Sequence, residues 1–156
     1  MKVLAIDPGY GRCGVAVLEK NGASGSLLYS DCIETSSDDG FPERLAAVGA
    51  EVARLLDLHA PDSMAIEKLY FTNNQKTAMR VAEVRGALLQ IAGTRDVPVF
   101  EYGPGEIKSA AAGSGRADKR QVAKMLHALL KIEKKIARDD EYDAIAIGVA
   151  HLALSR

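Results

Sequence analysis

The chain has 156 residues and a formal net charge of −1, and 47% of its residues are hydrophobic. This length predicts one domain, residues 1–156, with a substantial core, and the ordinary apolar fraction argues against disorder. The apolar stretch over residues 144–154 is too short to span a bilayer, and the first residues lack the pattern of a signal peptide. Cys13 and Cys32 suit neither a disulfide framework nor a metal motif. We therefore expect a cytoplasmic protein.

Charge is distributed unevenly along the chain. Residues 1–107 carry a net charge of −5, residues 108–138 carry +7 and residues 139–156 carry −3. A basic segment followed by an acidic one fits a polyanion bound beside a cation site. A solvated helix face would give the same pattern, and charge alone leaves these two interpretations equally weighted.

Strand-like runs dominate the beginning of the chain. Three of them are apolar or rich in β-formers: residues 1–6, 11–18 and 26–33. Residues 21–25, between the last two runs, have the composition of a turn. Three consecutive strands joined by tight turns predict an antiparallel meander, and helical spacing of apolar residues then predicts a helix over residues 41–58.

The rest of the chain alternates strands with helices. Further strands are expected over residues 62–67 and 97–102, and helices over residues 73–92, 106–112, 118–130 and 139–154. The order βββαβαβ followed by helices combines a meander with βαβ units. It predicts an α/β fold in which helices flank a mixed sheet of five strands.

Acidic residues follow two of the predicted strands, in the pairs Ile6-Asp7 and Ile66-Glu67. If these strands are parallel neighbours, Asp7 and Glu67 lie together at one edge of the sheet. Asp140 and Asp143 are three residues apart, so they share one face of the first turn of the last helix. We expect all four carboxylates to converge at the same edge.

Each acid taken alone also has a simpler explanation. Asp7 suits the turn before Pro8-Gly9, Glu67 suits an ion pair, and acids at the start of a helix are favoured by its dipole. All four spaced for convergence favour a cation site instead. Carboxylates without Cys or clustered His select Mg²⁺ or Mn²⁺, and two such ions roughly 3.5–4 Å apart suit phosphodiester hydrolysis.

Five segments in the same order resemble the RuvC family of Holliday junction resolvases, which have a ribonuclease-H-like fold. They cover nearly the whole chain: IDPGYGRCGVAV (6–17), AIEKLYFTNN (65–74), VRGALL (84–89), VFEYGPGEIKSAAAGSGRADKRQV (99–122) and DDEYDAIAIGVAH (139–151). The resemblance implies a homodimer with two Mg²⁺ ions per active site. Its activity would be to resolve four-way DNA junctions by symmetric paired nicks, leaving 5′-phosphate and 3′-hydroxyl ends, in recombination and DNA repair.

The resemblance also implies roles for particular acids. The family's metal ligands and catalytic acids map onto Asp7, Glu67, Asp140 and Asp143. Some family members carry His in place of Asp140, and Asp139 and Glu141 flank it as alternative ligands. The choice between Mg²⁺ and Mn²⁺ in the cell is left open.

Basic and aromatic residues map onto catalysis and DNA binding. Lys108 and Lys119 match basic residues that the family uses in catalysis, and Lys119 opens a helix after a Gly-rich loop, where positive charge suits a phosphate. The residues expected to contact DNA are Tyr70, Phe71, Asn73, Asn74, Arg80, Lys108, Arg116, Lys119 and Arg120. Either Tyr70 or Phe71 would wedge or stack at the junction centre.

Two other classes of function compete with the resolvase. A junction-binding module without catalysis would not need the complete set of acids. A ribonuclease of the same fold, or a nucleotide-phosphate-binding protein, would share the first acidic motif, although the chain is short for a nucleotide site between two domains. The branch-migration proteins RuvA and RuvB are expected partners from the family resemblance alone.

Overall fold

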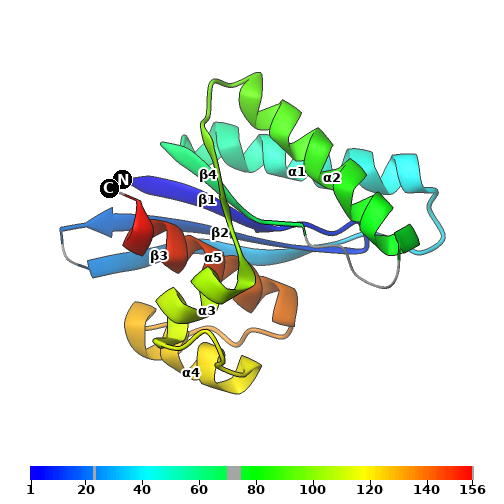
Figure 1. Ribbon diagram of the computed structural model, residues 1–156. Helices are drawn as coiled ribbons and strands as arrows, with labels where there is room; N and C mark the ends of the chain where they lie inside the picture. Colours follow the sequence, from blue (N-terminus) through cyan, green and yellow to red (C-terminus); the bar gives the residue numbers. More distant parts are fainter. Residues whose placement is uncertain (23, 70–74, 156) are drawn as a thin grey trace.

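A mixed sheet of five strands lies at the centre of the computed structural model, which describes residues 1–22, 24–69 and 75–155 (Figure 1). The strands are β1 (Lys2–Asp7), β2 (Arg12–Asn21), β3 (Ser24–Glu34), β4 (Ser63–Glu67) and β5 (Val99–Tyr102). They lie in the order β3-β2-β1-β4-β5. β1, β2 and β3 pair antiparallel, whereas β4 pairs parallel with both β1 and β5. The expected α/β fold with an antiparallel meander is confirmed.

Helices cover both faces of this sheet (Figure 1). The helices are α1 (Phe41–His59), α2 (Gln75–Gly93), α3 (Pro104–Ala112), α4 (Lys119–Leu130) and α5 (Asp139–Leu154). α1 and α2 lie on one face and α5 on the other, with α3 and α4 packed against α5. The core is accordingly divided into two clusters, because alternate strand residues point to opposite faces. Within the described part of the chain, no helix has the length and apolarity needed to cross a membrane.

Several element boundaries differ from the sequence prediction by a few residues, and those of the first hairpin and of α3 have clear local reasons. β2 and β3 continue as far as the pair Asn21–Ser24, and Gly22 takes the left-handed φ of 69° that glycine tolerates at the end of a hairpin. α3 begins at Pro104, two residues early, because Gly103 is the N-cap and proline suits the first helical position. Neither difference changes the order of the elements.

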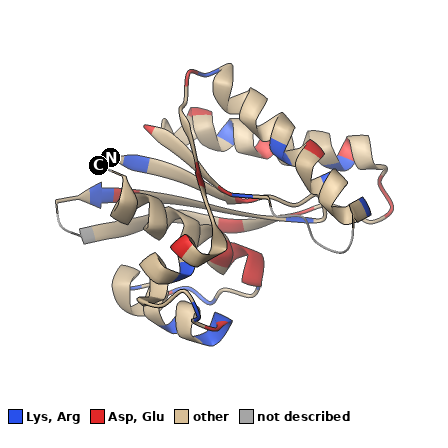
Figure 2. Ribbon diagram, in the orientation of Figure 1, with Lys and Arg blue, Asp and Glu red and all other residues tan. Residues whose placement is uncertain are grey.

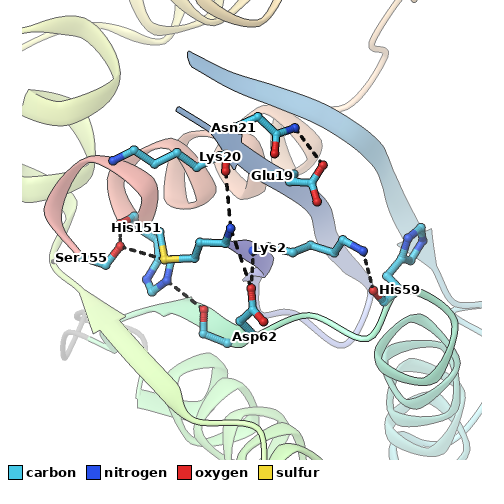
Figure 3. Close-up of polar contacts among 10 residues, drawn as sticks. Lys2, Glu19, Lys20, Asn21, His59, Asp62, His151 and Ser155 are labelled. Carbon is cyan, nitrogen blue, oxygen red and sulfur yellow. Dashed lines mark hydrogen bonds and ion pairs between the residues drawn. The ribbon is translucent and has the colours of Figure 1, made fainter. Parts of the chain in front are cut away.

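Contacts near the two termini close one end of the sheet (Figure 3). Lys2 donates from Nζ to the carbonyl of His59 at 2.9 Å. His151 of α5 is 1% exposed, and its ring nitrogens lie 2.8 Å from Ser63 Oγ and 2.9 Å from the Tyr102 hydroxyl. Burial lowers the pKa of His151. His151 is therefore a packing residue, and it ties the C-terminal half of α5 to β4 and β5.

Candidate active site

β1 and β4 end side by side at the opposite end of the sheet. They are parallel, with Ile6 opposite Ile66, so Asp7 and Glu67 follow at the same edge. Side chains alternate along a strand, and the alanines two residues before each acid belong to the core cluster under α5. Both carboxylates therefore lie on the face of the sheet that α5 covers.

The first turn of α5 packs against this edge through a glycine. Gly14 of β2 is opposite Asp7 in the sheet register. A Cβ atom added to Gly14 would lie only 1.8 Å from the main-chain oxygen of Asp140. Only glycine allows this approach of helix backbone to strand backbone, and it brings Asp140 and Asp143 alongside Asp7.

Electrostatic repulsion links the four acids. Burial raises the pKa of Asp7 to about 8, aided by the negative charges of Asp143, Glu67 and Asp140. Burial also raises the pKa of Glu67, with Asp143 as the next cause. The pKa of Asp143 is raised by burial as well, although the nearby Lys119 opposes the change. Near neutral pH, Asp7 therefore holds a proton unless a cation takes its place.

The described acids are not arranged as a closely spaced set of metal ligands. Among the described residues, no group of three or more His, Cys, Asp or Glu side chains converges closely enough to hold an ion. Lys119 Nζ instead lies 3.2 Å from Asp139 Oδ2 and 3.9 Å from Asp143 Oδ2. Arg12 Nε lies 3.4 Å from Asp140 Oδ2. The carboxylates thus share one electrostatic site, but less tightly than the sequence prediction supposed, because basic side chains pair with them.

The donor set nevertheless fits a hard divalent cation. It consists of carboxylate oxygens from two strand ends and one helix start, and such oxygens are the ligands that Mg²⁺ and Mn²⁺ prefer. A cation beside Asp7 would oppose the burial and repulsion that keep this carboxyl protonated. The predicted ligands Asp7, Glu67, Asp140 and Asp143 would have to draw closer together around such an ion.

The two acids that flank Asp140 have different surroundings. Asp139 has a 70% exposed side chain and pairs with Lys119. Glu141 is 6% exposed, and its carboxylate contacts side chains from β3 and from the segment before α5. The negative charge of Asp140, by contrast, helps to raise the pKa of Asp7.

A cleft of about 410 Å³ opens next to the acids, between the end of β4 and the helices α3, α4 and α5. Glu67 and Asp143 line it together with Lys108 from α3 and with Lys119 and Arg120 from α4. Figure 2 shows the acidic first turn of α5 close to basic residues of α3 and α4. Both predicted catalytic lysines and two of the four predicted acids therefore border one cavity.

Six predicted DNA contacts remain, and the two that the structure describes, Arg80 and Arg116, do not line this cleft. Four lie outside the described residues, so their roles and the choice of wedge stay predictions: Tyr70, Phe71, Asn73 and Asn74. Arg80 on α2 forms an ion pair with Glu83 at 3.0 Å and lies over the ring of Phe41. Arg116 lines a separate groove along α4.

The sequence reasoning missed Arg85, which supports the site from behind. Its side chain is 9% exposed and donates to the main-chain oxygen of Glu67. It also lies 3.1 Å from Glu101 Oε1 on β5. One feature of the sequence could have identified Arg85: it is a basic residue between Val84 and Leu88, two apolar positions of one helix. Both of these positions are buried.

The fold and the acids at its edge together define a class of protein. An antiparallel meander extended by parallel strands, with carboxylates at the ends of β1 and β4 and at the start of the last helix, is the ribonuclease-H-like arrangement. The family model described as "Crossover junction endodeoxyribonuclease RuvC" matches residues 3–151. The chain belongs to the RuvC family.

Individual relatives align over almost the whole chain. RuvC of Petrotoga mobilis is 43% identical over 151 residues, which cover 97% of this chain and 93% of the relative. RuvC of Moorella thermoacetica is 40% identical over 155 residues, covering 99% and 93%. The structure of T. thermophilus RuvC in complex with a Holliday junction substrate matches with a TM-score of 0.91 and 33% identity, covering 97% of this chain and 93% of that one.

Proposed function

We propose that this chain is a divalent-metal-dependent endonuclease that resolves four-way DNA junctions. The products would be symmetric paired nicks with 5′-phosphate and 3′-hydroxyl ends, formed in recombination and DNA repair. The observation that carries the proposal is the placement of Asp7 and Glu67 at neighbouring strand ends, with Asp140 and Asp143 beside them, in a member of the RuvC family. The T. thermophilus relative, solved with a Holliday junction substrate, supports the choice of DNA.

The proposed cofactor is Mg²⁺, with Mn²⁺ as a substitute, two ions per site held by Asp7, Glu67, Asp140 and Asp143. Ions bound there would supply a hydroxide nucleophile and would stabilise the leaving 3′ oxygen. The four acids would hold the cations next to the substrate phosphate. The four carboxylates suit this cofactor because Mg²⁺ prefers ligands that are all oxygen.

Lys108 and Lys119 would act on the substrate phosphate. Both line the cleft with Glu67 and Asp143. The side chain of Lys119 is 70% exposed, so it can leave its ion pairs with Asp139 and Asp143 to meet a phosphate oxygen. In that position it would stabilise the negative charge that develops on the phosphate in the transition state.

The wider DNA interface would use the basic segment 108–138, whose net charge is +7. Arg116, Lys119 and Arg120 are its proposed phosphate contacts. Further contacts are proposed on the side of α2, from Asn73, Asn74 and Arg80, with Tyr70 or Phe71 as the wedge. Recognition of a four-way junction would come from the spacing of two active sites in a homodimer of single nuclease domains. RuvA and RuvB are the proposed partners in the cytoplasm.

Mapping of nicks on a mobile four-way junction tests the proposal. Each strand is labelled in turn and incubated with the protein in Mg²⁺ or in EDTA. We expect paired nicks at symmetric positions in Mg²⁺ and none in EDTA. Binding without nicking in Mg²⁺ would support a junction-binding module instead, and preferential cutting of an RNA–DNA hybrid would support a ribonuclease.

A further inference from the structure

A buried acid in the first turn of α5 is not part of the proposed metal site. Glu141 is 6% exposed, and a buried carboxylate is stable only with good partners. Ser30 donates its hydroxyl to Glu141 Oε1 at 2.7 Å, and Lys134 Nζ lies 2.6 Å from the same oxygen. Lys134 also donates to the main-chain oxygen of Ser30 at 2.6 Å, which closes a network of three residues.

This network joins segments that are far apart in the chain. Ser30 lies on β3, and Lys134 lies in the segment between α4 and α5. In the sheet register Ser30 is opposite Ala16, which is opposite Ala5 of β1, two residues before Asp7. The contact between Ser30 and Glu141 therefore links the first turn of α5 to the part of the sheet that carries Asp7.

The other ion pairs of this turn lack a side chain as buried as that of Glu141. Its N-cap, Arg138, makes no side-chain capping hydrogen bond. The ion pairs of Arg138 with Glu34 and of Arg12 with Asp140 have substantially exposed side chains, and pairs of this kind contribute little to stability. The backbone contact at Gly14 limits how close the helix comes, but it provides no hydrogen bond that fixes the rotation of the helix.

We propose that Glu141, held by Ser30 and Lys134, is a positioning residue for the metal ligands. It fixes the rotation and height of the first turn of α5, so that Asp140 and Asp143 present their carboxylates toward Asp7. This role rests on the proposed function, because it assumes that those carboxylates bind divalent cations. Loss of the network should lower the affinity for divalent cations even where the loss of folding stability is small.

Direct measurement of Mn²⁺ binding to the whole chain without DNA tests this role. Free Mn²⁺ is followed by its electron paramagnetic resonance signal, for wild type, Ser30→Ala, Glu141→Ala and Glu141→Gln. We expect Ser30→Ala and Glu141→Ala to bind Mn²⁺ about 10- to 100-fold more weakly, the range typical of residues that orient metal ligands. Glu141→Gln keeps an oxygen acceptor for Ser30, so it should recover part of the affinity.

Cleavage supplies a second readout. The Mg²⁺ concentration for half-maximal nicking should rise by a similar factor in Ser30→Ala, whereas the rate at saturating Mg²⁺ should approach that of wild type. Lys20→Met is the matched control, because Lys20 Nζ donates to the carbonyl of Leu152 at the other end of α5, at 2.9 Å. This control should lower the melting temperature and leave Mn²⁺ affinity unchanged.

Three outcomes would count against the positioning role. If Ser30→Ala and Glu141→Gln melt at a lower temperature but bind Mn²⁺ as wild type does, the network is structural only and the proposed function stands. If Lys20→Met weakens Mn²⁺ binding as much as Ser30→Ala does, the effect belongs to general helix stability. If wild type neither binds Mn²⁺ nor cuts a junction, the proposed function fails and the positioning role fails with it.

Discussion

Asp7 is a largely buried acid that is repelled by the neighbouring carboxylates, and it is a proposed metal ligand. It is the acid whose pKa is raised to about 8, and its charge is influenced by all three of the other proposed ligands. A carboxylate in this position is unfavourable without a cation, which is the electrostatic condition expected of a metal-binding active site. Two predictions concern this single residue.

The first prediction is that Asp7→Asn abolishes nicking of a four-way junction in Mg²⁺ and leaves junction binding intact. The amide keeps the shape of the side chain but removes a negative ligand. Cleavage is measured on labelled junctions, and binding by gel shift in EDTA. Asp39→Asn, an exposed acid in the loop before α1, is the control and should cut normally. Cleavage by Asp7→Asn at the wild-type rate would refute the assignment of the ligand.

The second prediction concerns the pH dependence of stability without metal. Between pH 3.8 and about 8 the folded protein holds a proton on Asp7 that the unfolded chain releases, so the free energy of unfolding falls as pH rises. The contribution of this group is fully present below pH 3.8 and is lost above about pH 8. The Asp7→Asn variant has no carboxyl group at this position and does not lose this stability as the pH rises. In EDTA, the melting temperature of the variant minus that of wild type should therefore increase from pH 5 to pH 9.

Thermal unfolding in EDTA at several pH values measures this difference. About 1 kcal/mol corresponds to roughly 2–4 °C in a domain of this size, so a relative gain of several degrees is expected. Asp39→Asn should show a melting temperature that differs from wild type by a constant amount across the same range. A pH-independent difference for Asp7→Asn would show that Asp7 ionises normally in the folded protein.

At the scale of elements, the packing of α5 on β2 decides whether the acids meet. The helix packs closely on β2 at Gly14, which lies opposite Asp7 and against the main chain of Asp140. Local sequence favours the helix and the strand separately, but their close approach at this end depends on the missing side chain of Gly14. Arg85 acts similarly behind β4, where it holds the main chain of Glu67.

The third prediction is that Gly14→Ala destabilises the protein and impairs cleavage. The new Cβ would meet the main-chain oxygen of Asp140, which cannot turn away as a flexible side chain would, so the start of α5 has to move. Overpacking of this kind typically costs about 1–3 kcal/mol. Urea unfolding and junction nicking are the measurements. Gly93→Ala, with no atom within 4 Å of the added Cβ, is the matched control and should unfold close to wild type.

At the scale of the whole molecule, opposite charges are separated along the chain but meet in space. The acidic first turn of α5 and the basic residues of α3 and α4 border the same cleft (Figure 2). A net charge near zero therefore agrees with DNA binding, because the negative charge is gathered where cations are proposed and the positive charge lies where phosphates would pass. Affinity for a junction should then depend strongly on salt.

The fourth prediction is that Arg116→Ala and Arg120→Ala each flatten the salt dependence of junction binding. Loss of one phosphate contact changes the slope of log affinity against log salt by about 0.9. The measurement is fluorescence anisotropy of a labelled junction over a salt series in EDTA. Arg54→Ala on α1, on the opposite side of the sheet, is the control and should keep the wild-type slope. An unchanged slope for Arg116→Ala and Arg120→Ala would place the DNA elsewhere.

The elements and the main acids could be read from the sequence because their signals are local. Alternation, helical spacing and turn residues act over a few neighbouring positions, and they predicted the order of strands and helices found in the structure. The acids Asp7 and Glu67 were recognisable because each follows a strand-like run. Their placement at one edge then followed from parallel pairing of the two strands.

The surroundings of those acids were decided only by the tertiary structure. The contact between Ser30 and Glu141 joins residues 111 positions apart, and no local pattern distinguishes this buried acid from its neighbour Asp140. The pairing of Lys119 with Asp143 and the close approach at Gly14 depend in the same way on how separate elements pack. Composition and periodicity therefore determined which elements form, whereas long-range packing determined the partner, the burial and the pKa of each charged group.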